Sequence, residues 1–429
     1  MAMTQIGFIG LGKVGLPIAL ALTIHGDRAV YAYDPAWTPG ALPEDNTGEP
    51  GVKYLLDKVD RGEAVLNIVG STLEVVRQVG NNGVVFVAVA TPHPAELDGT
   101  RPLGGMRQGA DFDYRQLREA LAAIDEASLA LGYDLVVAVV STVAPGTLDK
   151  LRRELGPTRL SLVYNPAFIR LGSVIEDFRD PDFVLLGGDQ PKAIEQVWQC
   201  LRTAMRWLSG LPVLRMSTVS AEMVKLACNS YQTLKITWGN EIAALCTLTG
   251  ADMAEVTHAL RNSKRISDPA VRPGLGEGGP CRVRDLLVLN WLADRSPLAT
   301  ELFGDLLFSR ERQAVLIAAM VRDLSAQHAL PAVILGRAYK PNTSMIYGSP
   351  ALLVSHYLPA VPVWDPLIDQ PDPDLFEVPH VYLIGVAHRE FVDRDRWPAG
   401  SVILDPWCRV AAHEGVTVKW IGRPSPQPR

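Results

Sequence analysis

The glycine run Gly10-Leu11-Gly12-Lys13-Val14-Gly15 constrains the fold of this chain more than any other feature. It follows directly after an apolar run at residues 6–9 and opens a segment with helical spacing at residues 14–24. A strand that passes through G-x-G-x-x-G into a helix is typical of a doubly wound α/β domain, because the glycines permit a tight turn and close packing of helix on strand. The sequence therefore predicts a parallel sheet with helices on both faces.

The same turn predicts a dinucleotide site. The N–H groups at the start of a helix bind phosphate, and Asp34, which ends the next apolar strand, can accept hydrogen bonds from ribose hydroxyls and would repel a 2′-phosphate. A glycine-rich turn without a ligand is the alternative, and the combination of strand, helix and acidic residue argues against it. We therefore expect NAD rather than NADP as the cofactor, held by Gly10, Gly12, Lys13, Val14, Gly15 and Asp34.

The 429 residues are enough for two or three domains. Residues 217–249 predict one long helix, and alternation of apolar strands with helices returns after about residue 331. We expect an α/β fold in which two Rossmann-like, doubly wound parallel-sheet domains are joined by a central helical domain. The expected domains are an NAD-binding domain at 1–205, a helical dimerisation domain at 206–305 and a C-terminal Rossmann-like domain at 306–429.

Composition narrows the function classes. The net charge of −6 argues weakly against a general nucleic-acid binder. The five cysteines are odd in number and form no CxxC pair, and the histidines show no metal-ligand spacing, so we expect no metal site. Each histidine, His93 among them, is expected to be a surface or packed residue. No signal peptide or membrane-spanning stretch is indicated, which predicts a cytoplasmic protein.

Cys281 is the candidate nucleophile. It follows four glycines in eight positions and precedes an apolar run that predicts a helix from about residue 286 onward. A thiol at the start of that helix, beside Arg282 and Arg284, would be favoured as the thiolate. The other four cysteines are expected to be small buried hydrophobes.

Two further polar groups belong to the candidate chemistry. Lys225 and Asn229 are four residues apart, so they share one face of the long helix and could hold a water or a developing alkoxide. An ordinary exposed pair is the alternative. Asp285 lies four residues after Cys281, where it could also simply complement the charge of the helix N-terminus.

Several motifs in order give the chain a resemblance to the UDP-glucose/GDP-mannose dehydrogenase family of nucleotide-sugar oxidoreductases. Besides the glycine run, the motifs are Thr91-Pro92, Ser141-Thr142-Val143-Ala144-Pro145-Gly146-Thr147, Asn165-Pro166-Ala167-Phe168, Ser173 to Phe178, Glu222 to Asn229, Gly278-Gly279-Pro280-Cys281 and Ala338-Tyr339-Lys340-Pro341-Asn342-Thr343.

The resemblance implies that a primary alcohol of a nucleotide sugar is oxidised by NAD through a thiohemiacetal and a thioester on Cys281 to a uronic acid. It also implies a homodimer formed through the long helix and assigns site residues. The implied catalytic residues are Cys281, Lys225, Asn229, Asp285 and Thr142, the implied cofactor residues add Thr91 and Thr142 to the glycine turn, and the implied substrate residues are Phe168, Lys225, Asn229, Gly276 and Lys340.

The chain departs from the family pattern around the expected pocket. Ala167 and Leu171 stand where the family has glutamates, and the first of these is the expected base for thioester hydrolysis. Trp407 replaces a substrate-facing arginine. Three hypotheses follow: a four-electron dehydrogenase with a substitute base such as Glu277, diverted chemistry that stops at the aldehyde or passes the acyl group to another nucleophile, and a sugar-nucleotide-binding protein without turnover.

Overall fold

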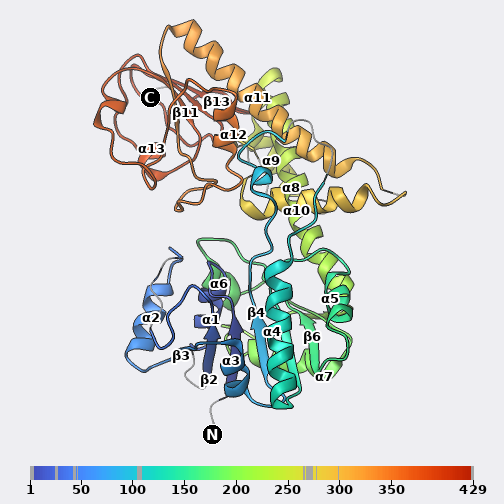
Figure 1. Ribbon diagram of the computed structural model, residues 1–429. Coiled ribbons are helices and arrows are strands. Elements are labelled where there is room, and N and C mark those ends of the chain that lie inside the picture. Colours follow the sequence, from blue (N-terminus) through green and yellow to red (C-terminus); the bar gives the residue numbers. More distant parts are fainter. Residues whose placement is uncertain are drawn as a thin grey trace. The chain divides into compact units, whose positions relative to one another are not determined.

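The computed structural model describes residues 4–24, 28–41, 45, 47–103, 109–263, 266, 274–276, 278–297 and 299–426. The chain divides into two compact units (Figure 1). The first contains Met1–Pro92 and Phe112–Leu226, and the second contains His93–Asp111 and Ala227–Arg429. The second unit therefore includes a short segment, here called the strap (residues 93–111), that interrupts the first unit in the sequence.

The first unit is built on a sheet that has eight strands in the described residues, in the order β3-β2-β1-β4-β5-β6-β7-β8. Neighbouring strands pair in parallel, apart from an antiparallel contact between β6 and β7. The strands are β1 (Thr4–Ile9), β2 (Arg28–Tyr33), β3 (Val65–Ile68), β4 (Val84–Val87), β5 (Leu135–Val139), β6 (Leu160–Tyr164), β7 (Val184–Gly187) and β8 (Val213–Met216).

Helices cover both faces of this sheet. Buried side chains of α1, α2, α6 and α7 form one cluster with alternate strand residues such as Phe8 and Phe86. On the other face α3 packs on β1, where the site of a Cβ at Gly7 meets Val75 at 2.8 Å, and α4 packs against α3. The helices are α1 (Gly15–Ala21), α2 (Val52–Asp60), α3 (Thr72–Val79), α4 (Arg115–Leu131), α5 (Thr147–Leu155), α6 (Val174–Arg179) and α7 (Pro191–Leu201).

The second unit contains a parallel sheet with five strands in the part of the chain that is described, in the order β10-β9-β11-β12-β13. One face packs on α11 and α12, and the other carries a cluster that includes Tyr382, Phe391 and Trp397. The strands are β9 (Ala332–Leu335), β10 (Val363–Trp364), β11 (Val381–Ile384), β12 (Val402–Asp405) and β13 (Thr417–Trp420). The expectation of two doubly wound α/β sheets is thus confirmed.

The predicted long helix is also confirmed, as α8 (Thr218–Thr249). It begins in the first unit and continues into the second. The remaining helices are α9 (Met253–Arg261), α10 (Pro280–Ala293), α11 (Leu302–His328), α12 (Pro350–His356), α13 (Arg389–Val392) and the 3-10 turns η1 (Ala95–Leu97) and η2 (Pro373–Phe376).

Five observed strands lie outside the segments that the sequence predicts as strands: β3, β6, β7, β8 and β13. Three of them, β3, β8 and β13, are edge strands of four residues that are only partly buried. A short strand with mixed exposure carries little of the apolar signal that marks a central parallel strand.

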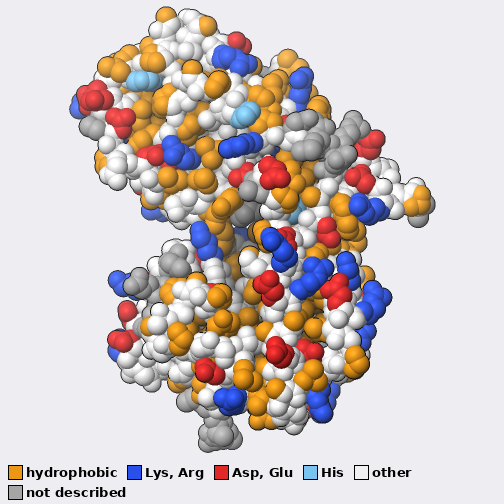
Figure 2. Space-filling view, in the orientation of Figure 1, with side chains coloured by type: hydrophobic (Ala, Val, Ile, Leu, Met, Phe, Trp, Pro, Cys, Tyr) orange, Lys and Arg blue, Asp and Glu red, His pale blue; other side chains and the backbone are white. Residues whose placement is uncertain are grey.

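Two surface properties follow from the described side chains. No helix in the described ranges is long and apolar enough to cross a bilayer. On the face drawn in Figure 2, acidic and basic side chains are interspersed over each unit.

Candidate functional site

The surroundings of the three glycines in the turn after β1 differ, and a Cβ atom would have a different consequence at each. Gly10 has a φ of +92°, and a Cβ there would lie 2.7 Å from the carbonyl oxygen of Ala88. At Gly15 a Cβ would lie 2.0 Å from the carbonyl oxygen of Gly10. Gly12 faces open space, with no atom within 4 Å of a Cβ position. This arrangement leaves room for a pyrophosphate against the turn, so the residues present fit a dinucleotide.

Asp34 is tied to that turn. Its Oδ2 atom accepts a hydrogen bond from the N–H of Leu11 at 2.7 Å, and its Oδ1 atom accepts one from Ala36 at 2.9 Å. In the loops that follow β4 and β5, the Oγ1 of Thr91 donates to the carbonyl oxygen of Thr142 at 2.7 Å. The structure thus brings together Thr91 and Thr142, which sequence reasoning assigned to the cofactor site, because β4 and β5 are neighbours and both loops leave their carboxyl ends.

Lys225 is buried, with 7% of its surface exposed, and so is not the ordinary surface residue considered as the alternative. Its Nζ atom donates to the carbonyl oxygen of Ala167 at 2.9 Å and lies 4.8 Å from the centre of the Phe168 ring. Phe168 in turn packs against Phe183 at 4.8 Å between ring centres. The loop after β6 is therefore held by Lys225 although Ala167 offers only a methyl group as its side chain.

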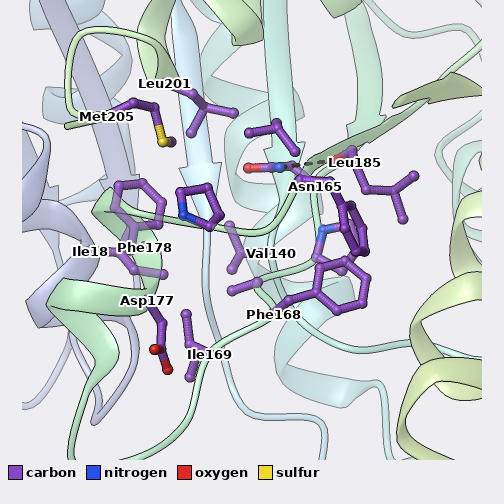
Figure 3. Close-up of a pocket in the computed structure, with 15 residues that line it drawn as sticks. Ile18, Val140, Asn165, Phe168, Ile169, Asp177, Phe178, Leu185, Leu201 and Met205 are labelled. Carbon is purple, nitrogen blue, oxygen red and sulfur yellow. Dashed lines mark hydrogen bonds between the residues drawn. The ribbon is translucent and has the colours of Figure 1, made fainter. Parts of the chain in front are cut away.

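An apolar cavity of about 40 Å³ lies behind this loop, inside the first unit (Figure 3). The loop residues Ala167, Phe168 and Ile169 line one side, and Phe178 and Met205 are among the side chains opposite. Such a small, apolar space is too poor in polar partners to hold an ordered water network. Asp177 is among the residues that line it, so the hydrogen bonds of this carboxylate decide whether the cavity offers a proton acceptor in place of the two absent glutamates.

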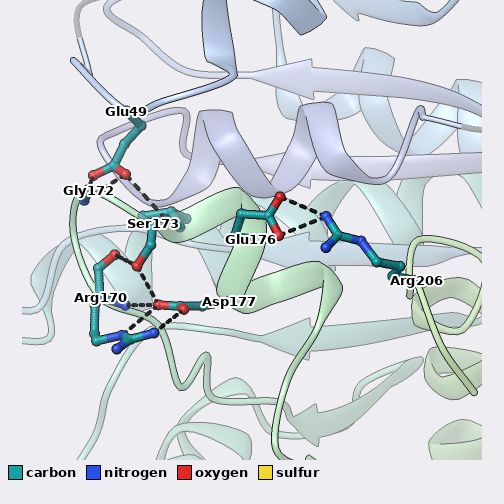
Figure 4. A network of polar contacts seen from close by, with 8 residues as sticks. Glu49, Arg170, Gly172, Ser173, Glu176, Asp177 and Arg206 are labelled. Atoms are coloured by element: carbon teal, nitrogen blue, oxygen red, sulfur yellow. Dashed lines mark hydrogen bonds and ion pairs between the residues drawn. The ribbon is translucent and has the colours of Figure 1, made fainter.

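The carboxylates next to the loop accept hydrogen bonds from the loop itself (Figure 4). Both oxygens of the buried Glu49 accept from the N–H of Gly172, at 2.7 and 2.8 Å. Asp177 accepts from the guanidinium of Arg170 at 2.7 Å and from the hydroxyl of Ser173 at 2.8 Å. These hydrogen bonds fix the loop.

Glu222 was quoted in the sequence only as part of a motif, yet it is fully buried near the start of α8. Its two oxygens accept from the backbone N–H groups of Gly146, at 2.5 Å, and Leu148, at 2.9 Å. It thereby caps α5, whose N-cap residue is a glycine and offers no side chain. Burial raises the pKa of Glu222 to about 7, against the opposing effect of the two N–H groups.

This shift predicts a pH-dependent stability. Between the ordinary pKa of a glutamate and about 7, the folded state binds more protons than the unfolded state, so the free energy of unfolding falls as the pH rises. The contribution of Glu222 amounts to about 3 kcal/mol over this window. We expect urea denaturation at about pH 5 and about pH 8 to show a smaller difference for Glu222→Gln than for the unchanged protein. Equal differences would contradict the prediction.

In the second unit, Cys281 is exposed near the start of α10, directly after Pro280. The apolar run after Cys281 is helical, as predicted, and the helix begins at Pro280. Gly279, the N-cap residue, has a φ of +107°, which a side chain would resist, and this frees the chain to turn into the helix. Glu277, the candidate substitute base of the sequence reasoning, lies outside the described residues.

Asp285, one turn further along α10, is fully buried. Its Oδ2 atom accepts from the amide of Asn229 at 2.5 Å, and its Oδ1 atom accepts from the guanidinium of Arg284 at 3.1 Å. A carboxylate buried in this way and held from both sides does more than complement the charge of a helix N-terminus. The structure joins Asn229 to Asp285 by a hydrogen bond, and Asp285 lies one helical turn after Cys281.

The glycine-rich segment before α10 packs on the loop that carries Lys340. The N–H of Gly279 donates to the carbonyl oxygen of Gly348 at 3.2 Å, and a Cβ at Gly279 would lie 3.1 Å from the Tyr339 ring. A Cβ at Gly274 would lie 2.7 Å from the indole of Trp407. The residue that replaces the family's arginine therefore lies against the segment that leads to the thiol.

The turn after β9 repeats the geometry of the turn after β1. Gly336 has a φ of +102°, and its N–H donates to the carbonyl oxygen of Trp364 at 2.7 Å. The N–H of Arg337 donates to the Oδ2 of Asp365 at 2.7 Å, as Leu11 does to Asp34. Burial alone would raise the pKa of Asp365, but hydrogen bonds from His388 and the backbone hold it well below its usual range. The two turns thus share the contact with an acidic residue of the neighbouring strand, although the next helix after β9, α12, begins only at Pro350.

His93 is a residue that the sequence did not single out and that has a shifted pKa. It is partly buried at the start of the strap, and burial lowers its pKa to about 4. The charge of Arg284 lowers the pKa further, whereas Asp285 and Asp111 raise it. The signal available in the sequence was its position directly after Thr91-Pro92, at the carboxyl end of a strand of the parallel sheet.

The doubly wound sheet, its glycine turn and the acidic residue at the end of β2 define the class of NAD-dependent dehydrogenases. Two family models match, the NAD-binding domain of the UDP-glucose/GDP-mannose dehydrogenase family at residues 4–204 and the central domain of the same family at residues 219–307. The chain belongs to this family of NAD-dependent nucleotide-sugar dehydrogenases.

Relatives span most of the chain at low identity. The UDP-glucose 6-dehydrogenase of Pseudomonas aeruginosa is 28% identical over 81% of this chain and 74% of its own length. The UDP-glucose 6-dehydrogenase YwqF of Bacillus subtilis is 26% identical over 95% of this chain and 88% of its own length. The solved UDP-glucose dehydrogenase from Pyrobaculum islandicum has the same fold, with a TM-score of 0.78 at 24% identity over 98% of this chain and 97% of that one.

Proposed function

We propose that the chain oxidises a primary alcohol of a nucleotide sugar to a uronic acid through a covalent intermediate on Cys281. The alcohol loses a hydride and a proton to become an aldehyde, and the thiolate adds to the carbonyl carbon. Loss of a second hydride converts the thiohemiacetal to a thioester, and water then displaces the sulfur. NAD, when bound, supplies the acceptor for both hydrides.

The observation that carries this proposal is the exposed thiol one helical turn before a buried carboxylate that Asn229 holds at 2.5 Å. An exposed thiol can reach a sugar carbon, whereas the neighbouring Asp285 and Asn229 can orient a water or stabilise an oxyanion. In the first unit, the buried ammonium of Lys225 can stabilise negative charge that develops on an oxygen atom. Phe168, Gly276 and Lys340 are proposed to contact the substrate, and Thr142 the nicotinamide.

Cofactor stoichiometry tests the proposal. Purified protein is incubated with excess NAD and a limiting amount of UDP-glucose, UDP-N-acetylmannosamine or GDP-mannose, and NADH is measured at completion. Two NADH per sugar consumed are expected from the four-electron reaction. One NADH per sugar would mean that the reaction ends at the aldehyde. No NADH with any of the three sugars would favour a sugar-nucleotide-binding protein without turnover.

Diverted chemistry is the second candidate, and it rests on one specific observation. Ala167 and Leu171 cannot accept a proton, and the carboxylates of Glu49 and Asp177 beside that loop are bonded to it. A thioester that water attacks slowly survives long enough to meet an amine. Intact-protein mass during turnover separates the two candidates, because diverted chemistry leaves a persistent acyl adduct on Cys281.

We also propose that the chain forms a homodimer through α8. In the second unit this helix exposes Tyr231, Trp238 and Leu245, spaced seven residues apart, and Leu248 is 81% exposed. Apolar side chains at this spacing form one stripe on a helix, which a second copy of the same helix can cover. The proposed three-domain division, with 206–305 as the dimerisation domain, follows from the same helix.

Substitution of this stripe predicts a change in mass. Trp238→Glu places a charge at the centre of the stripe, so we expect sedimentation equilibrium to shift from a dimer to the 46.7 kDa monomer. Glu255→Lys, on the exposed side of α9, changes a charge without touching the stripe and should leave the dimer intact. A dimer that persists in Trp238→Glu would exclude this interface.

A further inference from the structure

The chain between β5 and α5, here called the β5–α5 segment (residues 141–148), is held by hydrogen bonds along its whole length. The hydroxyl of Ser141 donates to the carbonyl oxygen of Val89 at 2.7 Å, and the carbonyl oxygen of Thr142 accepts from Thr91. Further along, the backbone N–H groups of residues 144, 146 and 148 donate to two side chains from distant parts of the chain. The backbone of this segment is therefore fixed from outside.

The two side chains are a tyrosine and a glutamate. The hydroxyl oxygen of Tyr114, the N-cap residue of α4, accepts from the N–H of Ala144 at 3.0 Å. The carboxylate of Glu222, near the start of α8, accepts from the N–H groups of Gly146 at 2.5 Å and Leu148 at 2.9 Å. Both side chains are buried, so the three N–H groups depend on these acceptors rather than on water.

Capping of α5 explains only part of this set of hydrogen bonds. Because the N-cap residue of α5 is Gly146, Glu222 supplies the acceptor that a glycine side chain lacks. Ala144 and Thr142, however, lie before the helix. Thr142 is partly exposed, whereas the residues on either side of it are buried. The hydrogen bonds thus fix the backbone around one residue whose side chain can meet a ligand.

The strand order decides which half of NAD lies near this segment. In a doubly wound sheet, a dinucleotide binds across the carboxyl ends of the strands where the strand order reverses, which is here between β1 and β4. Asp34, after β2, suits the ribose of the adenosine half, and the glycine turn after β1 suits the pyrophosphate. The nicotinamide half then extends toward β4 and β5, and Thr142 follows β5.

We propose that Glu222 and Tyr114 are positioning residues for the nicotinamide half of NAD, and that they act by fixing the β5–α5 segment around Thr142. Neither side chain touches the cofactor in this role, because both act through backbone N–H groups. A segment that is ordered before NAD arrives loses no further entropy when NAD binds. The inference rests on the proposed function in one respect, the contact of Thr142 with the nicotinamide, and it requires no acyl group on Cys281.

Loss of the carboxylate should weaken the binding of NAD selectively. Glu222→Gln keeps the shape of the side chain but has one acceptor oxygen, so one of the two N–H groups loses its partner. At about pH 8 the wild-type carboxylate is ionised, because burial raises its pKa only to about 7. By isothermal titration calorimetry at this pH, we expect the Kd for NAD to rise about 10-fold and the Kd for ADP, which lacks the nicotinamide half, to change less than about twofold.

The tyrosine gives an independent test on a different helix. Tyr114→Phe removes one hydroxyl and keeps the ring that packs edge-on against Phe112. The N–H of Ala144 then loses its acceptor, so we expect the Kd for NAD to rise about fivefold, again with little change for ADP. This variant tests the role of the segment even where Glu222→Gln does not fold, because Tyr114 lies outside α8.

Two matched controls make the same chemical changes elsewhere in the first unit. Glu119→Gln on α4 and Tyr54→Phe on α2 alter exposed side chains and should leave both affinities unchanged. Equal weakening of NAD and ADP in the Glu222 and Tyr114 variants would mean that these residues only stabilise the unit, and it would overturn the proposal. An unchanged Kd for NAD would overturn it as well. The titrations contain no sugar, so a failure of the chemistry on Cys281 would alter the NADH yield and not these results.

Discussion

Replacement of Cys281 by serine should abolish the second oxidation. A serine hydroxyl is a much weaker nucleophile than a cysteine sulfur, so it adds poorly to an aldehyde, whereas Cys281 offers an exposed sulfur near the start of α10. We expect the rate of uronic acid formation to fall by about 10³-fold or more, with no acyl adduct on the protein. The affinity for NAD should not change, because the glycine turn and Asp34 belong to the other unit.

The matched control for this experiment is Cys246→Ala. Cys246 is a buried cysteine of α8 that packs against Ala243 and Met253, away from the glycine-rich segment. Its loss should cost about 1 kcal/mol of stability and leave the NADH yield at two per sugar. If Cys281→Ser also yields two NADH per sugar at an unchanged rate, no thioester forms on this residue.

Replacement of Asp285 by alanine should have the largest effect on stability. The carboxylate is fully buried and accepts from Asn229 and Arg284, so its removal leaves an amide and a guanidinium without their acceptor. Breaking a buried charged pair from one side costs about 3–5 kcal/mol. We expect about 4 kcal/mol here, measured as the shift in the urea midpoint at constant slope, together with a loss of turnover.

Two controls test whether the loss of stability in Asp285→Ala comes from the buried contact with Asn229. Asp294→Ala removes an exposed aspartate from the end of the same helix and should change stability by less than about 0.5 kcal/mol. The double variant Asn229→Ala/Asp285→Ala should cost less than the sum of the single variants, with a coupling of about 0.5–3 kcal/mol. Strict additivity would mean that the contact between Asn229 and Asp285 contributes little.

Much of the fold was predictable because its signals are local. The apolar, β-branched strands at the centre of each sheet and the long helix at residues 217–249 are continuous patterns in the sequence. The edge strands β3, β8 and β13 and the inner strands β6 and β7 were missed, because strand pairing, which no local pattern records, decides whether a short segment joins a sheet.

The sequence likewise predicted only part of the candidate site. Residue types and spacing indicated Cys281, Asp285 and the Lys225–Asn229 pair, since a helix fixes which of its residues share a face. The sequence could not indicate that Glu222 caps α5. This contact joins residues that are 74 positions apart in the chain, and only packing creates it.

The sequence by itself thus determined the glycine turn with its acidic partner Asp34 and the thiol at a helix start, because steric freedom and helix periodicity act over a few residues. Only the tertiary structure decided which charged groups are buried together. Burial depends on the packing of distant elements, and burial raises the pKa of Glu222 to about 7 and lowers the pKa of His93 to about 4.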